Sequence, residues 1–274
     1  MPTKFNFNKK NNILIGAIHL PPILGYPDFP GFEVAFENAK ADLEVFQKAG
    51  FDAVIIENNY DIPHFENINP SVAVAMSVLC YQLKQIATIP IGISVLWNDY
   101  KIALSIAKTI GADFIRIPVF VDTVETSYGV IKGNSRDVIG FRKSIDAENI
   151  LIYTDIHVKH AKLLSSNSLI ESAKNAISEG SDGLIITGKW TGEQPSIEDL
   201  KSVREFVGDF PIIAGSGVDN KNIKEIFSYA NSCIISTSVK EGINYSEEIN
   251  IKNYSQRIDL EKCIKLVKTV NITI

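Results

Sequence analysis

The sequence has few cysteines, no long apolar run and no signal-like start. Its three cysteines, Cys80, Cys233 and Cys263, are isolated and lack C-x-x-C spacing, so they define neither a disulfide framework nor a zinc site. No apolar span of about 18 residues occurs, and the polar start MPTKFNFNKKNN lacks the apolar region of a signal peptide. We therefore expect no membrane span and a reduced, cytoplasmic protein.

The sequence also has no excess of positive charge. The 27 Lys and Arg residues are outnumbered by 32 Asp and Glu residues, which gives a formal net charge of -5. A protein that binds nucleic acid usually carries a basic patch, so we expect no nucleic-acid partner. A small anionic ligand stays compatible with this charge, because single cations and local dipoles can hold one.

No Pro-, Gly- or Ser-rich linker and no low-complexity tract divides the chain. The length of 274 residues is close to the roughly 250 residues of one α/β barrel. We therefore expect a single domain over residues 1–274, with a core at about 13–240 and a C-terminal helix at about 259–270.

Strand and helix signals alternate along the chain, which is typical of a parallel sheet with helical crossovers. Apolar residues three and four positions apart, such as Phe36, Ala39 and Leu43, indicate helices between the strands. Eight strands are expected, at Ile13–His19, Asp52–Glu57, Ile91–Leu96, Asp113–Ile117, Ile150–Asp155, Gly183–Thr187, Ile212–Gly215 and Cys233–Thr237. The pattern predicts an α/β fold, and the count of strands suits a (β/α)8 TIM barrel.

A weak internal repeat favours the closed barrel. Gly50-Phe-Asp52, Gly111-Ala-Asp113 and Gly180-Ser-Asp182 each end a helix with a glycine and lead into an even-numbered strand. Two odd-numbered strands instead follow Pro90 and Pro211. The alternation suggests two-strand units that close on themselves, although a doubly wound sheet would use the same turns.

Residues 210–227, FPIIAGSGVDNKNIKEIF, combine a buried strand, a glycine turn and an amphipathic helix. The two turn glycines permit positive φ, and Asp219 or Asn220 is expected to cap the helix. Such a junction holds phosphate on free backbone N–H groups, and barrels bind phosphate between the loops after strands 7 and 8. The predicted phosphate-binding residues are Thr187, Gly188, Thr191, Gly192, Gly215, Ser216, Gly217, Ser236, Thr237 and Ser238. The alternative is that these residues only make tight turns.

Polar residues also gather where the expected strands end, on the face that carries the active sites of TIM barrels. The catalytic candidates are His19, Glu57, Asn58, Asn98, Asp99, Arg116, Asp155, Lys159 and His160. Single members have structural alternatives, since Asp99 could cap a helix and Arg116 could pair with Asp155. Long connections at 20–32 and 118–134 are expected to act as lids.

The segment from Asp155 to His160 is the most informative cluster. In an extended strand Asp155, His157 and Lys159 would share one face. Lys159 could be a Schiff-base nucleophile or general base if its pKa is depressed, or a permanent cation for a substrate oxyanion. The sequence leaves these roles open.

A divalent metal is a further alternative, and no other cofactor is expected. Histidine and carboxylate side chains at the strand ends could form a mixed N/O site. The candidate ligands are His19, Glu57, Asp155 and His160. No H-x-H or H-E-x-x-H spacing brings them together in the sequence.

These motifs resemble the BtpA family. The matching stretches are Gly16-Ala-Ile-His-Leu-Pro-Pro22, Ile56-Glu-Asn58, Asp61-Ile-Pro63, Asn98-Asp99, Phe114-Ile-Arg116, Val158-Lys-His-Ala161, Thr187-Gly188, Thr191-Gly192 and Gly215-Ser-Gly-Val218. Trp97 stands where the family commonly has arginine, and could instead stack on a ring or line a wall. The resemblance implies a TIM barrel, linked in some members to photosystem I biogenesis and in others to enzymes of phosphorylated sugars.

The leading hypothesis is an enzyme that acts on a small phosphorylated, sugar-derived metabolite by acid/base proton transfer, as an isomerase, epimerase or lyase. Asp155, Glu57 or His19 would transfer the proton, and Lys159 and Arg116 would stabilise an enediolate-like oxyanion. The alternatives are a non-catalytic assembly or biogenesis factor on a barrel scaffold and a metal-assisted hydrolase. A homo-oligomer is also expected.

Overall fold

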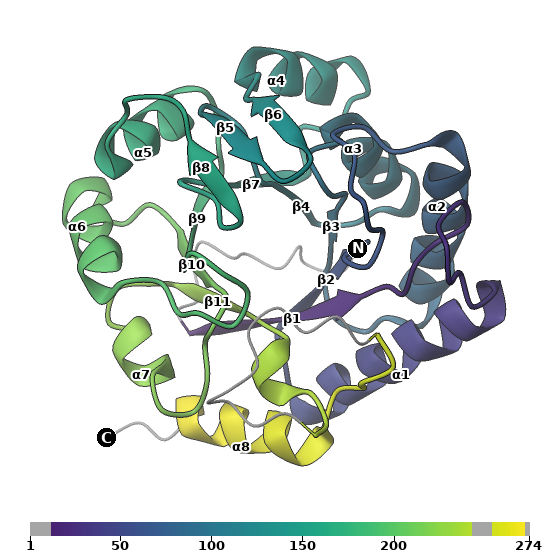
Figure 1. Cartoon of the computed structure of the whole chain (residues 1–274). Coiled ribbons are helices and arrows are strands. Elements are labelled where there is room, and N and C mark those ends of the chain that lie inside the picture. The colour runs from purple at the N-terminus through teal and green to yellow at the C-terminus, as the bar shows by residue number, and fades with distance from the viewer. Residues whose placement is uncertain (1–11, 243–253, 272–274) are drawn as a thin grey trace.

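The computed structural model describes residues 12–242 and 254–271. The barrel strands are β1 (Ile13–His19), β2 (Ala53–Glu57), β3 (Ile91–Ser94), β4 (Phe114–Ile117), β7 (Leu151–Asp155), β9 (Gly183–Thr187), β10 (Ile212–Gly215) and β11 (Ser232–Ile235). They are parallel and close into a barrel in the order β1-β11-β10-β9-β7-β4-β3-β2 (Figure 1). The predicted (β/α)8 fold is confirmed, and every expected strand lies within two residues of its observed bounds.

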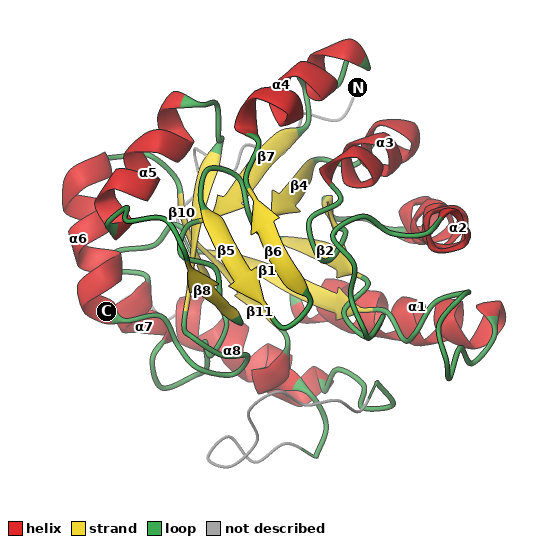
Figure 2. Cartoon of the chain, turned by 45° about the horizontal axis from the view of Figure 1, so that its top comes forward, coloured by secondary structure: helices red, strands yellow, loops and turns green. Residues whose placement is uncertain are grey.

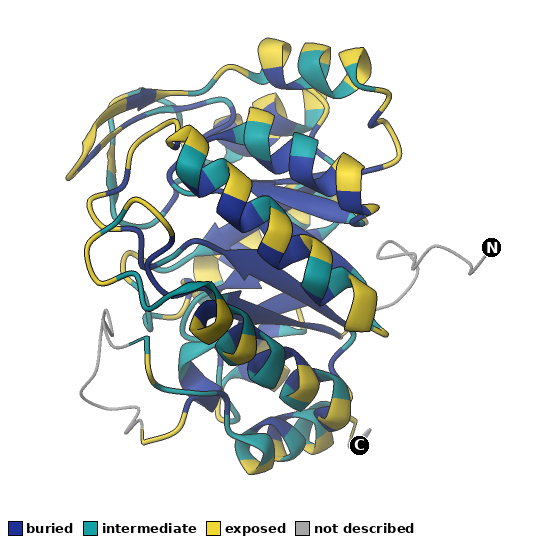
Figure 3. Cartoon of the chain, turned by 90° about the vertical axis from the view of Figure 1, so that its right-hand side faces the viewer, coloured by how far each residue is buried: buried dark blue, intermediate teal, exposed yellow. Residues whose placement is uncertain are grey.

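Helices surround the strands and turn their buried sides toward them (Figure 3). They are α1 (Phe32–Ala49), α2 (Pro70–Ile86), α3 (Tyr100–Ile110), α4 (Ser135–Ser144), α5 (Leu169–Ser178), α6 (Ile197–Val207), α7 (Ile223–Ile226) and α8 (Leu260–Asn271). The expected C-terminal helix is α8. Among these described helices none is long and apolar enough to cross a membrane. The polar amino-terminal segment considered above lies, as residues 1–11, outside the described residues.

The helix predicted after the glycine turn is much shorter than its pattern suggested. α7 is a single turn and follows Asn222, so neither Asp219 nor Asn220 caps it. The Asp219 carboxylate instead accepts hydrogen bonds from the backbone N–H groups of Lys221 and Asn222. A four-residue helix has a small dipole, so a phosphate site here depends on the loops rather than on the helix.

The interior has two apolar layers because strand side chains alternate in direction. Ile15, Ile55, Phe114, Tyr153 and Ile185 belong to the cluster inside the barrel. The other strand positions pack against the helices in a larger cluster. Toward the carboxyl ends of β1, β2, β4 and β7, the inward side chains become polar, and these positions form the floor of the site.

The glycine–aspartate repeat lies at the amino ends of the barrel strands, opposite the end that carries the polar side chains. Gly50, Gly111 and Gly180 have positive φ values of 89°, 70° and 101° after their helices. The aspartate two residues later accepts a hydrogen bond from the first or second residue of the preceding barrel strand, as Asp113 does from Ile91 at 3.0 Å and Asp182 from Ile152 at 2.8 Å. The repeat therefore stabilises the fold, in line with its position away from the active face.

The connection at 118–134 contains a β-hairpin, which was not predicted from the sequence. β5 (Thr123–Thr126) pairs with β6 (Gly129–Lys132) and with β8 (Ala161–Leu163) in an antiparallel sheet separate from the barrel (Figure 2). Val124 and Ile131 of this sheet pack with Trp97 in a small apolar cluster. Since the sheet follows β4 and β7, it stands over the carboxyl ends of the strands.

Candidate active site

The floor of the site is a buried arginine between two carboxylates. Arg116 donates from Nε and Nη2 to the two oxygens of Asp155, both at 2.8 Å, and from Nη1 to Glu57 Oε1 at 3.1 Å. All three side chains are buried. Burial opposes the charge on Arg116, but the two carboxylates outweigh it and raise the arginine pKa. The ion pair considered as a structural alternative for Arg116 is thus present.

His19 completes this layer from β1. Its Nε2 lies 3.6 Å from Glu57 Oε2. Burial lowers the pKa of His19 well below 6.5, and the charges of Lys240 and Lys159 lower it further. His19 is therefore a neutral imidazole at neutral pH, and its contact with Glu57 is not an ion pair. One oxygen of Glu57 stays outside the Arg116 hydrogen bonds.

The segment after β7 turns sharply, so Asp155, His157 and Lys159 do not form the extended run in which they would share one face. The strand ends at Asp155, and His157 and His160 have positive φ values of 51° and 59°. This turn brings Lys159 Nζ within 3.3 Å of Thr191 Oγ1, and His160 Nε2 within 2.8 Å of the same oxygen. Tertiary contacts with the loop after β9 override the extended pattern.

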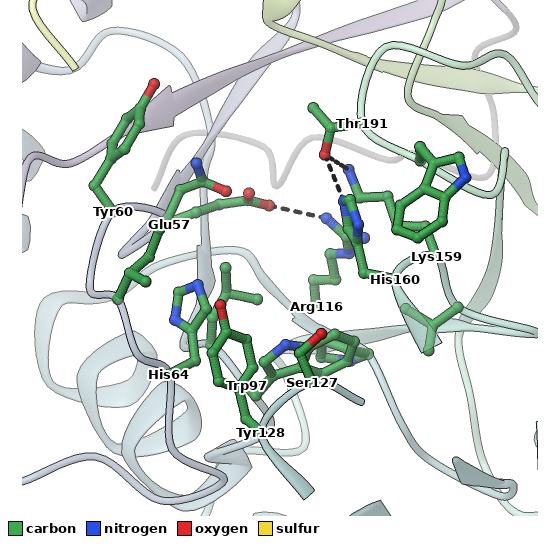
Figure 4. Close-up of a pocket in the computed structure, with 16 residues that line it drawn as sticks. Glu57, Tyr60, His64, Trp97, Arg116, Ser127, Tyr128, Lys159, His160 and Thr191 are labelled. Carbon is green, nitrogen blue, oxygen red and sulfur yellow. Dashed lines mark hydrogen bonds and ion pairs between the residues drawn. The ribbon is translucent and has the colours of Figure 1, made fainter. Parts of the chain in front are cut away.

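Lys159 lies in the mouth of the barrel beside Arg116 (Figure 4). Burial, and then the positive charge of Arg116, lowers its pKa from 10.5 to about 8, although Glu57 and Asp155 act in the opposite direction. The residue is partly exposed, but its amine points into the site. Burial and the charge of Lys159 also lower the pKa of His160 to about 4. The site therefore contains an amine, that of Lys159, with a pKa of about 8, together with the uncharged imidazoles of His19 and His160.

A small cavity of about 40 Å³ lies between this floor and the loops after β10 and β11. The hydroxyl oxygens of Ser236 and Ser238 are buried there and have no hydrogen-bond partner in the described part of the chain. Thr237 and Ser238 begin the 3₁₀ turn η1 (Thr237–Val239), so their backbone N–H groups have no acceptor within that turn. Seven predicted phosphate-binding residues line this cavity: Thr191, Gly215, Ser216, Gly217, Ser236, Thr237 and Ser238.

The other three predicted phosphate-binding residues, Thr187, Gly188 and Gly192, do not line it. Thr187 Oγ1 accepts from the Lys159 backbone N–H at 3.2 Å. A Cβ on Gly188 would lie 2.4 Å from the Glu193 carbonyl oxygen, so this glycine allows two loop segments to approach. The Gly192 N–H donates to Ser216 Oγ. These residues shape the loop after β9 and hold the turn at Lys159.

Three predicted catalytic residues, Asn58, Asn98 and Asp99, bind the backbone of loops and do not line the small cavity. Asn58 Oδ1 accepts from the Leu96 N–H at 2.7 Å, and Asn98 both donates to and accepts from the backbone of Val119. Asp99 caps the N-terminus of α3, which is the structural role considered for it in the sequence analysis. Its carboxylate also accepts a hydrogen bond from the backbone N–H of Ile68. Their carboxyl-end positions resemble those of catalytic groups, but their polar atoms bind the backbone.

The proposed metal ligands do not form a ligand set. Within residues 12–242 and 254–271, no three His, Cys, Asp or Glu side chains are arranged to hold a metal ion. Arg116 donates hydrogen bonds to Asp155 and to one oxygen of Glu57, and His160 is hydrogen-bonded to Thr191. The arginine thus takes the place between the carboxylates that a cation would otherwise fill.

A larger cavity of about 380 Å³ opens above the floor and shares Glu57, Arg116, Lys159 and Thr191 with the small one. Its walls carry aromatic side chains that the sequence did not single out: Tyr60, His64, Tyr128 and Trp190. Trp97 also lines it, which fits the wall position expected for this residue. The two cavities therefore adjoin at these four shared residues, and aromatic walls stand above a polar floor.

Lys240 is a buried lysine that the site candidates did not include, and it lines neither cavity but contacts Tyr60 in the wall of the larger one. Its Nζ donates to Tyr60 Oη at 3.1 Å and lies 5.4 Å from the centre of that ring. Burial lowers its pKa to about 8 although Asp42 acts to raise it. Its place directly after the hydroxyl-rich turn was the one sequence signal that could have identified it.

A closed (β/α)8 barrel with its polar groups gathered at the carboxyl ends of the strands belongs to the TIM-barrel class. The sequence model of the BtpA family matches residues 10–263. The chain belongs to the BtpA family.

Two relatives and one solved structure illustrate the likeness. An uncharacterized protein of Pyrococcus horikoshii is 34% identical over 93% of this chain and 98% of its own length. Photosystem I biogenesis protein BtpA of Synechocystis sp. is 32% identical over 90% of this chain and 86% of its own. (S)-3-O-geranylgeranylglyceryl phosphate synthase from Thermoplasma acidophilum, in complex with sn-glycerol-1-phosphate, has a TM-score of 0.59 at 14% identity and covers 97% and 96% of the two chains. This last likeness concerns the fold.

Proposed function

We propose that the chain is an enzyme that binds a small phosphorylated, sugar-derived metabolite. The observation that carries this proposal is the pair of buried, unpartnered hydroxyls of Ser236 and Ser238, two residues that line the small cavity together with Lys159 and Arg116. Buried polar groups are normally hydrogen-bonded, so two such hydroxyls beside cations suit an anionic ligand. The glycerol phosphate in the complex of the Thermoplasma acidophilum barrel is a ligand of this chemistry.

The proposed reaction is acid/base proton transfer, as in an isomerase, epimerase or lyase. Both oxygens of Asp155 accept from Arg116, so Glu57, with one oxygen outside those bonds, is the better proton acceptor. Lys159, with a pKa of about 8, can donate a proton or stabilise an oxyanion near neutral pH. His19, which is neutral, would orient Glu57 and the substrate by hydrogen bonds.

Charge balance supports this division of roles. Arg116 carries one positive charge between the two negative charges of Asp155 and Glu57. This group of three is therefore net negative, and protonated Lys159 brings it to neutrality. Adding a phosphate or an enediolate requires further donors, which the hydroxyl-lined loops supply, and the positive charge of Lys240 lies close enough to act on His19.

The phosphate site is tested by Ser236→Asp. A sugar phosphate at about a hundred times its dissociation constant should stabilise the wild-type protein by roughly 2.7 kcal/mol, and a carboxylate in the cavity should abolish this because it repels the phosphate. Thermal denaturation with ribose 5-phosphate, glycerol 3-phosphate and inorganic phosphate measures the effect. Ser202→Asp, exposed on α6, adds the same charge away from the cavity and is the matched control.

The proposal fails if Ser236→Asp and Ser202→Asp respond to these ligands as the wild-type protein does. Ser236→Ala refines the result. It removes one buried hydroxyl without adding charge, so phosphate affinity should fall roughly tenfold, the value of one hydrogen bond to a charged group.

An exposed apolar stripe on α2 favours the homo-oligomer and would equally serve an assembly role. Val74, Val78 and Tyr81 lie at helical spacing and are between 43% and 64% exposed. Three such residues on one helix face suit a protein interface better than solvent. The stripe is therefore the proposed contact between copies of this chain.

The double variant Val74→Lys/Val78→Lys should convert the oligomer to monomers, because two charges would be buried in the interface. Light scattering after size-exclusion chromatography measures the mass. Phe206→Lys is the control, since Phe206 is 46% exposed on α6 without such neighbours. If the wild-type protein is a monomer, the proposed homo-oligomer is wrong, and the apolar stripe on α2 would have to contact a different partner.

A further inference from the structure

Building on the proposed function, we infer that the phosphorylated substrate carries a planar aromatic or heteroaromatic ring, which binds in the larger cavity while the phosphate binds in the small one. The larger cavity has about 380 Å³ and shares four lining residues with the small cavity. A single ligand can therefore extend from one into the other. The wall residues of the larger cavity define the chemistry of its outer part.

The size of the cavity exceeds what a sugar phosphate alone needs. Cavities of roughly 300–1,000 Å³ bury ligands the size of drugs. If the phosphate occupies the hydroxyl-lined loops, the sugar carbons lie over Glu57, Arg116 and Lys159. The outer part of the cavity then remains for another group of the same molecule.

The walls are built from two pairs of rings on separate loops. His64 and Tyr128 meet edge to face at 5.4 Å, and His160 and Trp190 at 5.3 Å. In Figure 4, His64 and Tyr128 stand together on one side of the cavity, and His160 lies across from them. The loops come from β2, the β5–β6 hairpin, β7 and β9, so the barrel brings the rings together from four directions.

These rings leave aromatic surface uncovered. Trp190 is 50% exposed and Tyr128 is 41% exposed, whereas most large apolar side chains of the barrel are buried. Both line the cavity, so the part of their surface that faces it can contact a ligand there. A planar ring stacks on such faces with little loss of conformational entropy.

Among the described residues, the remaining outer lining carries no charged side chain, and Asn59 and Ser127 are its uncharged polar members. Ile62, Leu96, Pro118 and Val158 are apolar, and both histidines are neutral at neutral pH because burial lowers the pKa of each to about 4. The charged groups lie on the floor. The outer part therefore suits an uncharged ring, and the amphipathic site as a whole suits a ring joined to a phosphorylated sugar.

The test compares adenosine 5′-monophosphate, ribose 5-phosphate and adenosine by isothermal titration calorimetry. The first two differ only in the ring, so the monophosphate should bind at least about tenfold more tightly than ribose 5-phosphate, as stacking of one base predicts. The double variant Tyr128→Ala/Trp190→Ala should remove this difference and leave ribose 5-phosphate binding unchanged. Phe206→Ala, an exposed aromatic on α6, is the control and should change nothing.

Equal affinity for the monophosphate and ribose 5-phosphate would overturn the ring inference and leave the phosphate site intact. Equal weakening of both ligands by the double variant would overturn it too, because the aromatic side chains would then contact the sugar. If adenosine binds as tightly as the monophosphate and the variant weakens both, the aromatic subsite stands and the phosphate assignment fails. Failure of all three ligands to bind overturns both.

Discussion

Replacing Arg116 by methionine should lower the free energy of unfolding by about 3–5 kcal/mol, the range found when one partner of a buried ion pair is removed. Arg116 is 7% exposed and makes three charge-assisted hydrogen bonds to Asp155 and Glu57. Methionine fills similar space but leaves two buried carboxylates without their cation. Urea denaturation at neutral pH measures the loss.

Two further variants show whether the loss comes from unpaired charge. Adding Glu57→Gln and Asp155→Asn to Arg116→Met removes both carboxylate charges and should recover a substantial part of the stability. Lys84→Met is the control, because Lys84 and Asp113 are about one quarter exposed and 3.6 Å apart, and such pairs contribute at most about 1 kcal/mol. If Arg116→Met costs no more than the control, the floor is not the electrostatic group described above.

The barrel could be predicted because every strand repeats the same local pattern. Each barrel strand is a short apolar run, and the alternating inward positions decide which residues reach the floor. His19, Glu57, Arg116 and Asp155 were found in this way. β5, β6 and β8 were missed because these short strands, such as Thr123–Thr126, mix polar with apolar residues and lack the continuous apolar run that marks the barrel strands.

The walls of the site could not be predicted, since they consist of loop residues with no common spacing. Tyr60, Tyr128 and Trp190 line the same cavity only because separate βα loops come together above the floor. Loop contacts also explain why two residues were predicted as catalytic although they have a structural role. Asn58 and Asp99 stand at strand ends, as catalytic residues do, but nearby backbone groups bind their side-chain oxygens. Position along a strand predicts where a side chain lies, and only tertiary contacts determine what it binds.

Lys159 should react with acetic anhydride as an amine with a pKa of about 8. At pH 8 about half of its side chains are uncharged, which is roughly a hundredfold more than for a lysine with the usual value near 10.4. Labelling across pH 6–11, read by mass spectrometry of the peptide that contains Lys159, gives the midpoint. Lys201, more than half exposed on α6, supplies the reference peptide in the same sample.

The causes of this pKa predict how variants change it. Glu57→Gln removes a negative charge that raises the pKa, so the midpoint should fall further. A midpoint near 10 in the wild-type protein would show that Lys159 is a permanent cation, and would transfer the proton-transfer role to Glu57 and His19.

Stability gives an independent test of the same pKa. The unfolded chain keeps a proton on Lys159 up to about pH 10.4, whereas the folded protein loses it near pH 8. Unfolding therefore takes up a proton between these values, and stability rises with pH in this window. Lys159→Met should stabilise the protein at pH 7 by about 1–2 kcal/mol, a value reduced for partial exposure, and this gain should vanish above about pH 10. A destabilised variant at pH 7 would contradict the burial of this amine. A stabilised variant that no longer turns over substrate would show that the fold tolerates an unfavourable lysine because the reaction requires it.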